Sequence, residues 1–76
     1  MNRSYIINSL EAIVEDITGS AIKLPFSGEF EAFFEPEEFV AFRDMVAEEF
    51  DLPDYSIVDT ADTFRELIAL LENELF

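Results

Sequence analysis

The chain has 76 residues, half of them apolar, with nine Phe and neither Cys nor His; 18 acidic residues against four basic ones give a formal net charge of −14. This charge argues against nucleic acid and anionic membranes as partners, because binding either requires a basic surface. Without Cys or His there is no Ser-His or Cys-His triad and no thiolate metal site. We therefore expect a non-enzymatic protein with no cofactor or specific metal site.

The length fits a single domain spanning residues 1–76, with a small core that leaves a homodimer as open as a monomer. No apolar run is long enough to cross a membrane or to form a signal peptide, so a cytoplasmic location is the default expectation. A protein with a basic patch is the natural partner. The composition also allows the acidic residues to be nothing more than a solvated surface.

Apolar residues at helical spacing predict a first helix from Ser4 to Thr18, begun by Asn2 or Ser4 as the N-cap and ended by Gly19. The connection that follows, residues 20–35, contains the helix breakers Pro25 and Gly28 but is otherwise strongly apolar. We expect it to wrap the bundle with its aromatic side chains inward, and to form a short helix within residues 28–34.

A second long helix is predicted from Glu35 to Phe50, with Pro36 at the first helical position. The sequence Asp51-Leu52-Pro53 should end it, because the residue before a proline avoids the helical region. Its apolar face carries Phe39, Phe42, Val46 and Phe50. Its other face carries the acidic residues Glu37, Glu38, Asp44, Glu48 and Glu49. Arg43 is expected to pair with acidic residues of its own helix at i, i+4 spacing.

The remaining chain predicts one helical turn at residues 55–58 and a last helix capped by Thr63 and Glu66. The apolar face of that helix consists of Phe64, Leu67, Ile68, Leu71 and Leu75. No segment alternates at a period of two, so the predicted fold class is all-α.

The segment from Phe39 to Leu71 resembles acyl carrier proteins. The run Glu48-Glu49-Phe50-Asp51 and the following Leu52-Pro53-Asp54 are similar to that family's second helix and its exit. Ile57-Val58-Asp59-Thr60 and the segment from Thr63 to Ile68 are similar to its third helix and the start of its fourth. The resemblance implies a four-helix bundle with a long loop after helix one and a short third helix.

Acyl carrier proteins attach a phosphopantetheine arm to a Ser at the start of the second helix, in an Asp-Ser-Leu motif. This chain has Glu35-Pro36-Glu37 there, and proline has no hydroxyl to form a phosphodiester. The nearest upstream hydroxyl belongs to Ser27, which lacks the motif around it. The resemblance therefore implies a carrier-like module without its arm, whose residues Glu37, Glu38, Asp44, Glu48 and Glu49 bind a basic patch on a biosynthetic enzyme or complex.

Three alternatives remain open on the sequence. One is an acidic inhibitor or nucleic-acid mimic that blocks a basic groove. Another is a true acyl carrier that uses Ser27. In the third, Phe30, Phe33, Phe34 and Phe39 line a small apolar pocket for a lipid; the preferred interpretation of these rings is that they fill the core.

Overall fold

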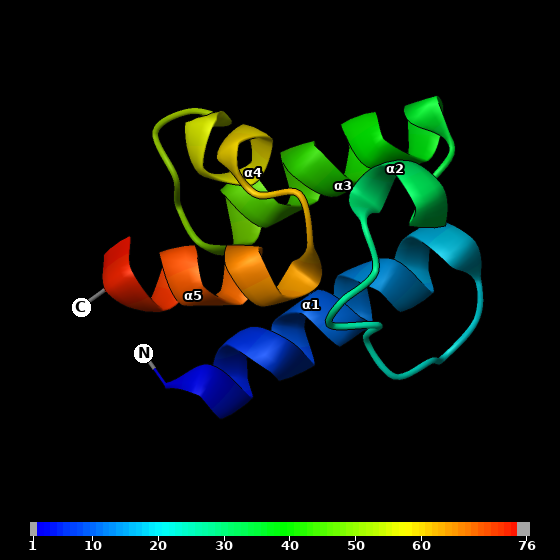
Figure 1. Ribbon diagram of the computed structural model, residues 1–76, viewed down its shortest axis with the longest axis horizontal. Helices are drawn as coiled ribbons and strands as arrows, with labels where there is room; N and C mark the ends of the chain where they lie inside the picture. The colour runs from blue at the N-terminus through cyan, green and yellow to red at the C-terminus, as the bar shows by residue number, and fades with distance from the viewer. Residues whose placement is uncertain (1, 75–76) are drawn as a thin grey trace.

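The computed structural model describes residues 2–74, which form five helices and no strand. The helices are α1 (Arg3–Thr18), α2 (Phe30–Phe33), α3 (Pro36–Glu49), α4 (Ser56–Thr60) and α5 (Phe64–Glu74). In Figure 1, α1 and α5 lie side by side, with α3 across α1 and the short α4 next to α5. The predicted all-α fold class is confirmed for the described residues.

The first helix has the predicted ends. The side chain of Asn2 accepts a hydrogen bond from the backbone N–H of Tyr5 at 2.8 Å, so Asn2, rather than Ser4, is the N-cap. At the other end Gly19 adopts a left-handed conformation with φ 78°, and its N–H donates to the carbonyl of Glu15 at 2.8 Å. This C-cap conformation is one that glycine adopts without a steric penalty.

The core is a single apolar cluster to which every helix contributes, and no polar or charged residue of the described chain is buried in it. Its members are Ile6, Leu10, Ile13, Val14, Leu24, Phe30, Phe34, Phe42, Val46, Phe50, Val58, Ala61, Phe64, Leu67, Ile68 and Leu71. Removing a side chain of this kind from water contributes about 1.5–3 kcal/mol. A core built from so many large side chains lets a chain of this length fold without disulfides or metals.

The connection from Ser20 to Glu29 packs inward only in part: Leu24 is buried and leads into the buried Phe30 of α2, whereas 40% of Ile22 is exposed. It is also hydrogen-bonded to the start of α5. The N–H of Phe30 donates to the carbonyl of Asp62 at 2.9 Å, and the N–H of Arg65 donates to the carbonyl of Phe26 at 3.0 Å. The aromatic ring of Phe26 is an exception to the inward packing, since 38% of that residue is exposed.

The predicted end of α3 is met to within one residue, with Phe50 as the C-cap, but the cause of the end differs from the predicted one. The helix ends at Glu49, and Asp51 has a left-handed backbone with φ 53°. The N–H of Leu52 donates to the carbonyl of Ala47 at 2.9 Å, and that of Asp51 to the carbonyl of Glu48 at 3.4 Å. This is a Schellman arrangement, so the backbone turns before Pro53 has any influence.

The final helix begins as predicted. The hydroxyl of Thr63 accepts a hydrogen bond from the N–H of Glu66 at 3.2 Å, while the Glu66 carboxylate accepts one from the N–H of Asp62 at 3.0 Å. The cap therefore reaches one residue further back than the predicted capping box. Near the other end of α5, Glu72 pairs with Arg3 at 2.6 Å. The predicted apolar position Leu75 lies outside the described residues.

Within residues 2–74, no helix is both long and apolar enough to cross a membrane.

Candidate functional site

The outer side of α3 carries two exposed carboxylates that make no side-chain hydrogen bond or ion pair with any other described residue. They belong to Glu37, in the first turn, and Glu48, in the last. Glu48 follows Glu37 by eleven positions, which is about three helical turns, so both side chains lie along one line of the helix. Of the five predicted partner-binding residues, these two remain available for a partner at no cost to the fold.

A third predicted residue, Glu38, has a structural role. Its carboxylate accepts a hydrogen bond from the backbone N–H of Glu35 at 2.9 Å, which satisfies a donor at the N-terminus of α3. The residue is also half-buried. Any partner that binds the Glu38 carboxylate therefore competes with the cap of the helix.

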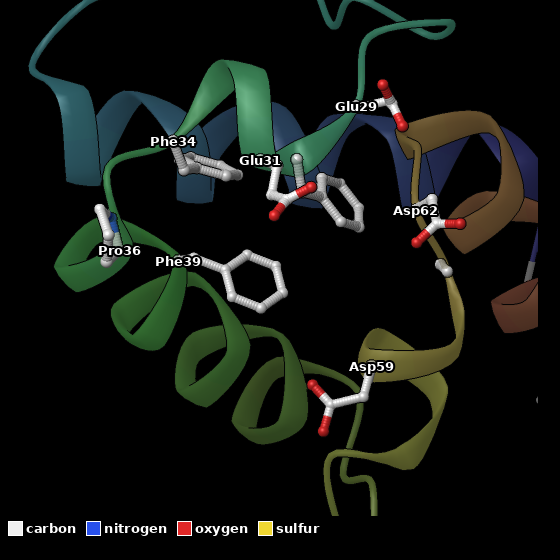
Figure 2. Close-up of a pocket in the computed structure, with 9 residues that line it drawn as sticks. Glu29, Glu31, Phe34, Pro36, Phe39, Asp59 and Asp62 are labelled. Carbon is white, nitrogen blue, oxygen red and sulfur yellow. The ribbon is translucent and has the colours of Figure 1, made fainter.

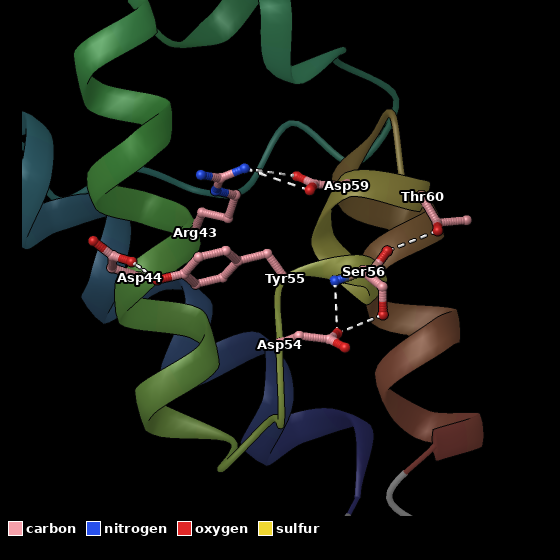
Figure 3. A network of polar contacts seen from close by, with 7 residues as sticks. All are labelled: Arg43, Asp44, Asp54, Tyr55, Ser56, Asp59 and Thr60. Atoms are coloured by element: carbon pink, nitrogen blue, oxygen red, sulfur yellow. Dashed lines mark hydrogen bonds and ion pairs between the residues drawn. The ribbon is translucent and has the colours of Figure 1, made fainter.

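The last two predicted residues are exposed, but each is bound to a tyrosine. Asp44 accepts a hydrogen bond from the hydroxyl of Tyr55, as Figure 3 shows, and Glu49 accepts one from the hydroxyl of Tyr5 at 2.7 Å. Each hydrogen bond raises the pKa of its phenol above the ordinary value of 10.0, because the neighbouring carboxylate disfavours the phenolate. These two carboxylates therefore join α3 to its neighbours.

The prediction for Arg43 is wrong. Its guanidinium pairs with Asp59 of α4 at 3.3 Å, and it lies over the ring of Tyr55 with 4.4 Å from Cζ to the ring centroid. Both contacts join α3 to α4 or to Tyr55, the residue before it, whereas the prediction placed the partner of Arg43 within α3. Arg43 therefore fastens the short α4 to α3, in an arrangement that combines an ion pair with a cation–π contact.

The start of α4 is fixed by a local polar turn. The carboxylate of Asp54 accepts hydrogen bonds from the hydroxyl of Ser56 at 2.6 Å and from its N–H at 2.9 Å. These bonds stabilise the carboxylate and lower the pKa of Asp54 below its ordinary value. The hydroxyl of Thr60 donates to the carbonyl of Ser56 at 2.7 Å. The side chains of Ser56 and Thr60 thus stabilise the conformation of α4 itself, whereas Asp59 binds Arg43 of α3.

A cavity of about 540 Å³ opens between α2, the start of α3 and the end of α4. Figure 2 shows the labelled residues around it, with the ring of Phe39 projecting into the space between α3 and α2. Its lining consists of Glu29, Phe30, Glu31, Phe34, Pro36, Phe39, Asp59, Ala61 and Asp62. Of the four aromatic residues that the sequence suggests for an apolar pocket, three line this cavity, and the fourth, Phe33, does not.

These aromatic rings belong to the core and to the cavity at the same time. Phe30 and Phe34 are buried, with 4% and 5% of each residue exposed, and Phe39 packs against them from the start of α3. The preferred interpretation, that the rings fill the core, is therefore confirmed for Phe30 and Phe34, and Phe39 keeps a partly exposed surface at the cavity. The carboxylates at the rim were missed, because Glu29, Glu31, Asp59 and Asp62 come from separate segments and share no local pattern.

The start of α3 does not offer an attachment point for phosphopantetheine. Pro36 is the first residue of the helix and has no hydroxyl. Ser27 is exposed in a turn that is closed by a hydrogen bond from the N–H of Gly28 to the carbonyl of Pro25 at 2.8 Å. That turn precedes α2 and is separated from the start of α3 by the whole of α2, so these residues do not fit the arm in its usual position.

No group of three or more acidic side chains in residues 2–74 is arranged to hold a metal ion. No family model, curated protein or solved structure matches this chain.

Proposed function

We propose that this chain is an acyl-carrier-protein-like module without a phosphopantetheine arm, which binds a basic patch on a biosynthetic enzyme or complex. The observation that carries the proposal is the outer side of α3, where Glu37 and Glu48 present exposed carboxylates that the fold does not use. Unpaired charges at a rim mainly steer association and set orientation, which suits a docking surface.

The order and lengths of the helices support this assignment. A long first helix is followed by an extended connection, an acidic helix, a helix of five residues and a last long helix. That order is the one the resemblance implies, with α2 as an additional short helix inside the connection. A carrier-like fold would present the acidic helix to its partner.

The missing hydroxyl at Pro36 supports a role that depends on binding alone. With no arm at the start of α3, the module has no covalent substrate to deliver there. Its contribution to a partner would be its surface. That surface is strongly acidic, because the chain has a formal net charge of −14. A field of that strength raises association rates with basic surfaces and weakens as salt is added.

The decisive experiment compares two double variants with the same change in charge. Glu37→Lys with Glu48→Lys alters the outer side of α3, and Glu15→Lys with Asp16→Lys alters exposed positions of α1. Each protein is used to capture partners from a lysate of the source organism. A captured partner is then purified, and its dissociation constant is measured at several salt concentrations.

We expect the α3 variant to weaken binding about tenfold or more and to flatten the salt dependence, while the α1 variant changes binding much less. Equal effects of the two variants would contradict a specific role for α3. Displacement of the partner by duplex DNA would favour the inhibitor or nucleic-acid mimic. A phosphopantetheine adduct on Ser27, detected by intact mass after incubation with coenzyme A and a phosphopantetheinyl transferase, would establish a true carrier.

A further inference from the structure

The cavity beside α2 has a preformed aromatic floor. The rings of Phe30 and Phe39 lie 5.6 Å apart between centroids, and those of Phe30 and Phe34 lie 6.3 Å apart. Phe30 also meets Phe64 of the core edge to face at 4.9 Å. Phe30 and Phe34 are almost fully buried, so the apolar surface open to a ligand is mainly that of Phe39 and Pro36. The rings beneath hold Phe39 in place, so an apolar ligand would not have to order this surface.

The rim of the same cavity is uniformly acidic. Glu29, Glu31, Asp59 and Asp62 line it, and none of its lining residues is basic. Within the described part of the chain, the carboxylates of Glu29, Glu31 and Asp62 form neither hydrogen bonds nor ion pairs. In Figure 2 the carboxylates of Glu31, Asp59 and Asp62 lie around the opening in front of the aromatic floor.

One rim carboxylate is already paired with a basic residue. Arg43 pairs with Asp59 at 3.3 Å and is held over the ring of Tyr55. It compensates one of the four carboxylates and leaves the other three. A ligand that enters the cavity therefore meets an apolar, aromatic surface below and uncompensated negative charge around the entrance.

We infer that this cavity binds an organic cation with an apolar body, such as an alkylammonium or arylammonium compound. The apolar body would cover the exposed parts of Phe39 and Pro36, and the cationic group would remain at the acidic rim, where the carboxylates and the ring of Phe39 both attract it. A fatty acid or another anion would face the same carboxylates with the opposite sign. A bare metal ion would gain nothing from the aromatic floor, and the acidic side chains of residues 2–74 are not grouped to hold one.

A cavity of about 540 Å³ falls within the usual size of small-molecule sites. This inference goes beyond the proposed function, because it concerns a small ligand at the start of α3 and needs no protein partner. Loss of one role leaves the other intact, since the residues at the cavity rim differ from the exposed pair Glu37 and Glu48.

Three probes with the same alkyl chain test the inference: octyltrimethylammonium, octanol and octanoate, each used below its micelle concentration. Binding is followed by the amide chemical shifts of isotopically labelled protein. We expect saturable binding of octyltrimethylammonium with a dissociation constant of about 1 mM or lower. The shifts should be centred on α2, the start of α3 and residues 59–62. Octanol should bind more weakly, and octanoate should be weakest.

Variants separate the cavity from the general negative charge. Glu31→Gln with Asp62→Asn removes two exposed rim charges, and Glu37→Gln with Glu48→Gln removes two charges from the outer side of α3. We expect the rim variant to weaken binding of the cation roughly fivefold and the matched control to change it less than twofold. Both variants replace exposed side chains, so both should stay folded.

Two results would overturn the inference. Equal binding of octanoate or octanol would show that the cavity selects an alkyl chain and not a cation. Equal weakening in the two variants, or the absence of saturable shifts at the cavity, would show that the ammonium group responds only to the overall charge.

Discussion

Within residues 2–74, each end of α3 keeps one exposed carboxylate free, Glu37 at the start and Glu48 at the end, but the two ends are joined to the rest of the fold in different ways. At the start, the Glu38 carboxylate caps its own helix and the contacts to the neighbouring α2 are made by packed aromatic rings. Towards its end, Asp44 and Glu49 are each bound by a tyrosine of another segment. Acidic composition alone therefore does not identify a binding surface, because some carboxylates are already part of the fold.

The largest effect on stability is expected from a change among the aromatic rings packed beside the start of α3. Phe30→Ala removes a buried ring that contacts Phe34, Phe39, Phe42 and Phe64. We expect it to lower the free energy of unfolding by about 3–4 kcal/mol, measured by urea denaturation. The matched control is Phe26→Ala in the same connection, where 38% of the residue is exposed. It should cost less than about 1.5 kcal/mol; equal losses would mean that the cavity floor is not part of the core.

A smaller effect is expected where α3 ends. Asp51 has φ 53°, a left-handed conformation that glycine adopts more readily. Asp51→Gly should therefore raise the free energy of unfolding by about 0.5 kcal/mol, and Asp51→Ala should lower it by about 1 kcal/mol. Urea denaturation of both variants checks this. If alanine were as stable as glycine, the Schellman arrangement would not determine where the helix ends.

The smallest effect concerns the two tyrosines, which are the only ones in the chain. Their hydrogen bonds raise both pKa values above 10.0 in the folded protein, so the unfolded chain loses these protons first as the pH rises. The stability from these bonds is therefore complete below pH 10 and falls as the pH rises through the folded pKa values.

Ultraviolet titration of the phenolates should show both tyrosines ionising at higher pH in the folded protein than in urea. The free energy of unfolding, measured by urea denaturation at several pH values, should fall at alkaline pH. Tyr5→Phe should remove part of this fall, and adding Tyr55→Phe should remove more of it. Identical titrations in folded and unfolded protein would show that neither carboxylate holds its tyrosine in solution.

Local patterns predicted the helices well. The helical spacing of Ile6, Leu10 and Val14 and the turn chemistry of Gly19 and Thr63 depend on neighbours in the sequence, so they can be read without the fold. The cause of the end of α3 was predicted wrongly for a physical reason. An aspartate gives little sign in the sequence that its backbone will have φ above zero, whereas Pro53 is an obvious helix breaker. The left-handed turn at Asp51 nevertheless comes before Pro53 along the chain.

The site was less predictable than the fold. Arg43 found its partner in Asp59 because the fold brings α4 against α3, and helical spacing cannot report a contact between helices. The acidic rim combines Glu29 and Glu31 with Asp59 and Asp62 from the opposite side of the cavity. Such a rim exists only after the chain has folded, whereas the exposure of Glu37 and Glu48 follows from the pattern of a single helix.

The hydrogen bonds between the connection and α5 have a consequence for how the molecule opens. They join Phe30 to Asp62 and Phe26 to Arg65, segments that are far apart in the sequence. The entropy of closing that long loop must be overcome before either bond forms, so both should form and break together with the docking of α5. In hydrogen exchange, the amides of Phe30 and Arg65 should therefore share one opening free energy, and a segment that looks like a loop should be as protected as the helix it touches.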